Sequence, residues 1–362
     1  MSDECTIVPA VTTVPAEDTT AAAATNRGSR PGHGRVVLVV LAILLNVALV
    51  LVIAWLVTHR DRVIDQVTVW NYTVPATIAE YAARADLTDG GRFLLYASTP
   101  SVSAGRAFDA ACSTRQEGVG ILGCYLPATR QTHLFDVTDA RLDGLEEVVA
   151  SHEMLHAAWD RMGAAERGAL APLLDAEAAK RTDDKDLTDK LAFYATTEPG
   201  ERLNELHSIL GTEYGSLSPA LEKHYALYFS DRTVVVGLHD KSNAVFVDQQ
   251  RQITNLTTQI TALAAGIDAD YAAYNAGYDA LSTDVANFNA RAKSGDFGSQ
   301  SAFEAERNEL LARQSDLDAQ YQSIADRHAR YDGLVAQLTS LNAEVDALNR
   351  SINITPRTPP SL

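Results

Sequence analysis

The sequence predicts an α+β domain that follows a single membrane-spanning helix and precedes an all-α coiled-coil hairpin. Three observations support this organisation: one long apolar run near the N-terminus, a few strand patterns followed by a helical block, and a seven-residue apolar repeat over the last third. The 362 residues are 46% hydrophobic, which is enough to bury a sizeable core. A wholly disordered chain is therefore excluded.

The composition also excludes several classes of partner and site. The chain carries 47 acidic and 30 basic residues, a formal net charge of -17. A nucleic-acid-binding surface would have to oppose this mean field, so we expect no nucleic-acid partner. Only three cysteines are present and none forms a CxxC pair, which excludes a disulfide framework, a cysteine zinc ribbon and a thioredoxin-like site.

The apolar run is predicted to be a transmembrane helix over residues 36–57. It contains 22 residues without a charge and would span about 33 Å. It is too long for a signal-peptide core and lacks a small-residue cleavage site, which argues against the signal-peptide alternative. Residues 1–35 have no apolar periodicity and are predicted to be a disordered tail.

Charge and cysteine positions indicate the orientation. Three arginines precede the run, whereas the two that follow it are partly offset by Asp61, so a cytoplasmic tail is slightly favoured. The remaining chain would then lie outside the cytoplasm, at the cell membrane. Cys112 and Cys124, twelve residues apart, would form a disulfide in such an oxidising compartment, with two buried thiols as the alternative. Cys5 falls in the tail.

Residues 63–240 are predicted to form the α+β domain. Helical spacing covers 75–86, and the apolar runs at 92–98 and 121–126 are typical of strands. Residues 131–137 alternate as a half-buried edge strand does. From about residue 143 to 230 the pattern is helical.

Residues 244–352 are predicted to form an antiparallel coiled-coil hairpin. Apolar residues alternate in threes and fours from Ile253 to Phe288, and recur every seventh residue from Phe303 to Ile352. The glycine-containing break between the two runs favours a hairpin, with an intermolecular coiled coil as the alternative. Residues 353–362 contain three prolines and are predicted to be a disordered tail.

The main chemical motif is His152-Glu153-Met154-Leu155-His156. On a helix the two histidines lie one turn apart on the same face, so both imidazoles can bind one cation while Glu153 lies beside a metal-bound water. The surrounding residues are uncharged, so a purely structural role would leave Glu153 buried without a partner.

The third ligand must come from elsewhere in the chain. The HExxHxxGxxH pattern of the metzincins is excluded because Trp159 and Met162 occupy its glycine and third-histidine positions. Further along, Tyr194, Glu201 and Glu205 stand in the spacing Y-x6-E-x3-E. With this spacing, about 60 residues of the chain resemble the gluzincin zinc metallopeptidases.

The resemblance implies a zincin-like fold for residues 63–240, with Zn²⁺ as the cofactor and His152, His156 and Glu201 as its ligands. It further implies that Glu205 orients a ligand imidazole. Glu205 and His207 remain alternative ligands.

The resemblance also implies the catalytic roles. Glu153 would act as general base on the metal-bound water. Tyr194 would donate a hydrogen bond to the developing oxyanion.

The expected function is therefore that of a membrane-anchored, extracytoplasmic zinc metallopeptidase that hydrolyses a peptide or protein substrate. The substrate would bind as an added strand beside the edge strand 131–137. The alternative is a non-catalytic cell-envelope scaffold that acts through its coiled coil, but the intact Glu153 argues against it. The coiled coil would either gate the site or bind a protein partner.

Overall fold

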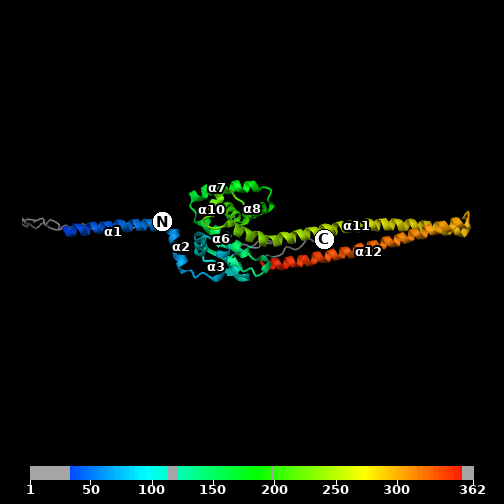
Figure 1. Cartoon of the computed structure of the whole chain (residues 1–362), viewed down its shortest axis with the longest axis horizontal. Helices are drawn as coiled ribbons and strands as arrows, with labels where there is room; N and C mark the ends of the chain where they lie inside the picture. The colour runs from blue at the N-terminus through cyan, green and yellow to red at the C-terminus, as the bar shows by residue number, and fades with distance from the viewer. Residues whose placement is uncertain (1–32, 113–120, 198, 353–362) are drawn as a thin grey trace, which may run out of the picture. The chain divides into compact units, whose positions relative to one another are not determined.

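The computed structural model describes residues 33–112, 121–197 and 199–352 (Figure 1). The chain divides into two units, residues 1–60 and 61–362. The first unit contains α1 (His33–Thr58), in which Val37–Thr58 has a mean hydropathy of 3.3 and no buried residues. One helix is thus long and apolar enough to cross a membrane, where the sequence predicts it. The two predicted tails lie outside the described residues, apart from residues 33–35, which belong to α1; Cys5 also lies outside them.

The second unit is mostly helical and contains one small sheet. Its first helices are α2 (Arg60–Asn71), α3 (Ala76–Arg84), α4 (Asp89–Ala97) and α5 (Gly105–Ala111). The helices that follow the sheet are α6 (Leu145–Arg161), α7 (Ala164–Ala178), α8 (Lys185–Thr197), α9 (Arg202–Glu213) and α10 (Pro219–Tyr225), with short 3-10 turns at Ala140–Leu142 (η1) and Ala179–Arg181 (η2). The sheet consists of β1 (Ser101–Ser103), β2 (Gly123–Leu126) and β3 (Gln131–Phe135).

The strand order β1-β3-β2 places β3 in the centre of the sheet. It pairs in parallel with β1 and antiparallel with β2. The strand predicted at 131–137 is present as β3, but the prediction that it lies at the edge of the sheet is wrong. The short serine-containing strand β1 pairs with one side of it. The edge next to the helical layer is β2 instead.

The predicted strand at 92–98 is also wrong, because residues 92–97 belong to α4 and Ser98 caps its end. Thr88 caps this helix by accepting a hydrogen bond from the main-chain N–H of Gly91. The segment contains no β-branched residue, so its intrinsic preference does not oppose a helix. Leu95 and Ala97 are buried on its inner face, and α4 packs against α6. The predicted helix at 75–86 is confirmed as α3.

Helix α6 lies at the centre of the core and is buried along most of its length. Met154, Leu155 and Ala157 have no exposed surface, and α3, α4, α9 and α11 pack around the helix. Gly144 begins it with a φ of 102°, and a side chain there would collide with Leu238 of α11. The helix that carries the histidine motif is therefore held rigidly from several sides.

The last two helices, α11 (Arg232–Ser294) and α12 (Gln300–Ser351), form the predicted antiparallel hairpin within one chain (Figure 1). The buried seam includes Ile260 and Leu281 of α11 and Leu338 and Ile324 of α12. Gly295, with a φ of 74°, ends α11. No break separates the predicted domains at residues 240–244, because α11 runs continuously from the core into the hairpin.

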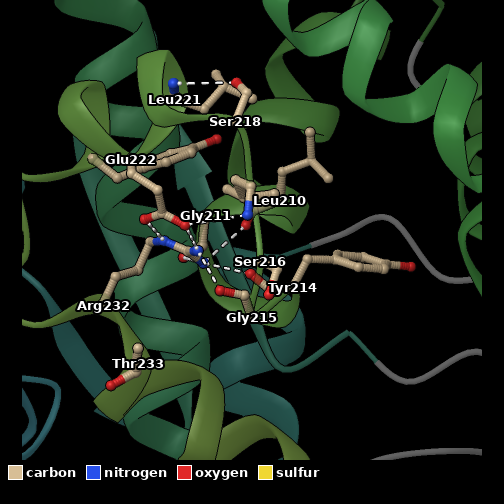
Figure 2. Close-up of polar contacts among 12 residues, drawn as sticks. Leu210, Gly211, Tyr214, Gly215, Ser216, Ser218, Leu221, Glu222, Arg232 and Thr233 are labelled. Atoms are coloured by element: carbon tan, nitrogen blue, oxygen red, sulfur yellow. Dashed lines mark hydrogen bonds and ion pairs between the residues drawn. The ribbon is translucent and has the colours of Figure 1, made fainter.

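The first turn of α11 is attached to the end of α9 by the buried Arg232 (Figure 2). Its guanidinium forms an ion pair with Glu222. It also donates hydrogen bonds to four main-chain carbonyls, those of Leu210, Gly211, Tyr214 and Gly215. A cation at the carbonyl end of a helix is stabilised by the helix dipole. The start of the hairpin is thus fixed to α9.

The predicted disulfide between Cys112 and Cys124 is present, with a Cα–Cα distance of 5.9 Å. It joins the end of α5 to the edge strand β2. The half-cystine Cys112 is buried together with Phe108 and Phe135.

Candidate metal centre

Two imidazoles and one carboxylate converge on the inner face of α6. Oε1 of Glu205 lies 3.4 Å from Nε2 of His156, and Oε2 of Glu205 lies 3.7 Å from Nε2 of His152. One ligand atom from each of the three residues lies within 4.8 Å of the other two. Oε2 of Glu205 is buried without a hydrogen-bond partner. The three side chains could therefore hold one metal ion.

Glu205 occupies the place that the sequence analysis assigned to Glu201. Helix α9 begins at Arg202, so Glu201 precedes its first turn, and its exposed side chain accepts a hydrogen bond from Asn204. Glu205 lies one turn later on the buried face, where only 2% of its surface is exposed. The packing of α9 against α6 therefore brings the alternative residue Glu205, and not Glu201, to the two histidines.

The expectation that Glu205 orients an imidazole is corrected at the same time, because another residue does so. Oδ1 of Asn204 lies 2.9 Å from Nδ1 of His156, and Oγ of Ser208 lies 3.3 Å from the same nitrogen. These contacts direct Nε2 of His156 toward Glu205. Asn204 and Ser208 were not expected from the sequence, although their spacing of four residues puts both on one face of α9, from which they reach the same nitrogen.

Glu153 lies beside the ligand group, with 6% of its surface exposed. Burial raises the pKa of its carboxyl, and the nearby His156 and His152 oppose that shift. The main-chain N–H of Tyr125 in β2 donates a hydrogen bond to it. Glu153 is thus placed between the ligands and the edge strand.

Tyr194 of α8 lines the same cavity and hydrogen-bonds to Glu205. Burial favours the neutral form of Glu205, yet His156, His152 and this hydrogen bond leave the pKa of its carboxyl below the ordinary value. Burial likewise opposes protonation of His152, but Glu205 and Glu153 leave the pKa of that imidazole raised. The ligand group therefore contains an ionised carboxylate in a buried setting.

His207, the other alternative ligand, is not part of this group. It is fully buried, its Nε2 lies 2.9 Å from Nε2 of His224, and its ring stacks on Tyr225. Burial holds the pKa of His207 well below its ordinary value. Among the residues that the structure describes, only His152, His156 and Glu205 group as possible metal ligands.

The ligand group opens into a cavity of about 580 Å³. Its walls come from β2, α6, α8, α9 and the first part of α11. Beyond the ligands, Nζ of Lys190 lies 2.6 Å from Glu213 and 2.7 Å from Asp186, and His239 lies 3.6 Å from Glu213. The cavity thus combines apolar walls with a few paired polar groups, as small-molecule and peptide sites do.

Comparison of the chain with protein-family models, with curated proteins and with solved structures gave no match.

Proposed function

We propose that this protein is a membrane-anchored zinc peptidase. The observation that carries the proposal is the convergence of His152, His156 and Glu205 at the floor of a cavity, with Glu153 beside them. Two imidazole nitrogens and a carboxylate oxygen are the ligand set of a catalytic zinc site that keeps one position open.

The spacing of these atoms fits zinc. Zinc–ligand bonds of about 2.0–2.1 Å in a tetrahedron place neighbouring ligand atoms about 3.3 Å apart. The distances from Glu205 to the two imidazoles, 3.4 and 3.7 Å, are close to that value. Oε2 of Glu205, which has no hydrogen-bond partner at 3.5 Å or less, would gain one in a bound cation.

When bound, zinc would polarise the substrate carbonyl and make water a stronger nucleophile. Glu153 would accept a proton from that water and later donate it to the leaving amine. Its position beside the ligands, on the wall of the same cavity, puts the carboxylate where it can take and return that proton. Tyr194 would exchange its hydrogen bond to Glu205 for one to the oxyanion, and Asn204 would hold His156 in position.

The edge strand β2 supports a peptide as the substrate. Within the described parts of the chain it pairs only with β3, and Gly123 and Tyr125 of β2 line the cavity. A peptide can add to such an edge through main-chain hydrogen bonds, which would bring its carbonyl groups past the metal ligands. The strand proposed for this role is therefore β2 rather than residues 131–137.

The disulfide and α1 support the location. A disulfide between Cys112 and Cys124 is typical of an oxidising compartment. Together with the apolar helix Val37–Thr58, it favours a single-pass protein at the cell membrane with the domain outside the cytoplasm.

The second candidate is a non-catalytic scaffold. The hairpin favours it, because a long two-helix arm exposes Tyr278, Leu311 and Tyr321 to a partner. The buried Glu153 favours the peptidase instead, since a scaffold gains nothing from a buried carboxylate that raises the cost of folding.

The test uses the full chain in detergent, with zinc measured by mass spectrometry and hydrolysis measured on a mixture of quenched fluorescent peptides. Glu153→Gln should retain zinc and lose hydrolysis, whereas Glu309→Gln on the exposed side of α12 should change neither. A wild-type chain that binds no zinc refutes the proposal. Zinc binding without hydrolysis of any peptide supports the scaffold.

A further inference from the structure

The base of the hairpin forms part of the wall of the metal cavity. Ser242, Asn243 and Phe246 of α11 line it, as does Ile352, the residue that ends α12. These residues face the same space as His152 and Glu153, although they are far from them in sequence. The hairpin is thus continuous with the candidate active site.

The end of α12 is held there by an apolar group that we name the root cluster. Leu142 of η1, Leu348 of α12 and Ile352 are buried in it, with exposed fractions of 1%, 0% and 2%. Partly buried residues complete the cluster: Leu122, Val137, Leu145, Val245 and Phe246. Leu122 immediately precedes the edge strand β2. The same contacts therefore hold the end of α12 and border the strand proposed to bind substrate.

The two hairpin helices are attached to the domain in different ways. Helix α11 is fixed by the buried Arg232 and by the ion pair between Lys241 and Asp143. Among the described residues, no hydrogen bond or ion pair within 4 Å joins α12 to the part of the unit that precedes α11, and the polar attraction between them is the weaker one of Glu344 for Arg141 of η1. Apolar contacts can separate without leaving buried polar atoms unpaired, so the end of α12 is the part that can move at lower cost.

We propose that the end of α12 is a movable wall of the metal cavity. Packed in the root cluster, it covers one side of the cavity, and its release uncovers the metal ligands and the free edge of β2. The inference rests on the proposed function only for the identity of what enters, a peptide.

The test measures how fast diethyl pyrocarbonate modifies His152 and His156 in the metal-free full chain, read by peptide mass spectrometry. Their side chains are now only 15% and 11% exposed. Leu348→Ala should make both histidines react at least about tenfold faster. The loss of a buried leucine side chain lowers the equilibrium constant for the packed state by more than about tenfold. The exposed His328 of α12 gives the reference rate.

Leu334→Ala is the matched control, since Leu334 is a buried leucine of α12 in the interior of the hairpin. It should leave both rates unchanged. His207, which is fully buried, reports unfolding: it stays unreactive if only the wall opens. If His207 reacts in Leu348→Ala, that variant is unfolding, and the milder variant Ile352→Ala is measured in its place.

Unchanged rates in these root-cluster variants, or an equal acceleration in Leu334→Ala, would overturn the movable wall. The measurement needs neither zinc nor hydrolysis. If the variants show the acceleration but the chain binds no zinc, the movable wall is supported and only the proposed peptidase function is refuted.

Discussion

Oε1 of Glu205 lies 3.4 Å from Nε2 of His156, although the two residues belong to different helices, α9 and α6. Leu206, Ile209 and Leu210 bury the same side of α9 against the core, and this packing turns Glu205 toward α6. The contact makes Glu205, rather than Glu201, the carboxylate of the candidate ligand group.

Glu205→Gln should therefore weaken zinc binding by more than about 100-fold, the upper range for losing a residue that only supports a ligand. Glu201→Gln should leave the affinity nearly unchanged, because its exposed carboxylate lies before α9. Competition with a chromophoric chelator measures both constants. If Glu201→Gln loses zinc while Glu205→Gln binds it normally, Glu201 is the third ligand, as the sequence led us to expect.

Asn204→Ala should reduce zinc affinity by about 10- to 100-fold, because it removes the hydrogen bond that orients His156. Asn308→Ala on the exposed surface of α12 provides the control. The same chelator competition is the measurement, and equal affinities in the two variants would exclude an orienting role for Asn204.

Gly123→Ala should slow hydrolysis while zinc stays bound. A Cβ at this position would lie 2.7 Å from Oε1 of Glu153 and 2.6 Å from Cγ1 of Val149, so the general base or the edge strand must move. Gly168→Ala is the matched control, because a Cβ there meets nothing within 4 Å and α7 tolerates alanine. Peptide hydrolysis at matched zinc content separates the two variants, and normal rates in Gly123→Ala would contradict the proposed position of Glu153.

Arg232→Met should lower the free energy of unfolding by about 3 kcal/mol, because it leaves Glu222 and several main-chain carbonyls without their charged donor. Arg251→Met, on the exposed side of the same helix, should have little effect. Denaturant unfolding of the full chain in detergent measures the difference. Equal stabilities would show that Arg232 does not fix the start of α11.

The free energy of unfolding should decrease as the pH falls below about 6.5, in part because of His224. Burial lowers the pKa of His224 in the folded chain, with Glu166 opposing the shift, so the unfolded chain binds a proton more readily. This contribution is present above the unfolded pKa and is lost toward acidic pH. His224→Gln should make the pH dependence shallower, whereas a slope equal to that of the wild type would refute it.

Parts of the fold could be predicted because they depend on neighbours in the sequence. The spacing of His152 and His156 places them on one helical face without any tertiary contact, and α6 confirms that helix. The seam of α11 and α12 follows from apolar periodicity in the same way.

The incorrect strand predictions concern residues whose secondary structure or place in the sheet depends on segments far away in the sequence. Residues 92–98 carry an apolar run that suits either a strand or a buried helix, and packing against α6 decided for the helix. The position of β3 depended on β1, a three-residue segment too short to be recognised from its pattern.

By itself the sequence determined the apolar helix, the helix with its two histidines, the hairpin and the cysteine pair, because each depends on composition or local spacing. Only the tertiary structure decided that Glu205 faces those histidines, that β2 is an edge of the described sheet and lies beside Glu153, and that Ile352 lines the same cavity. These relationships join residues that are distant in the chain, and the packing of α9, β3 and α12 brings them together to bury apolar surface that no local pattern specifies.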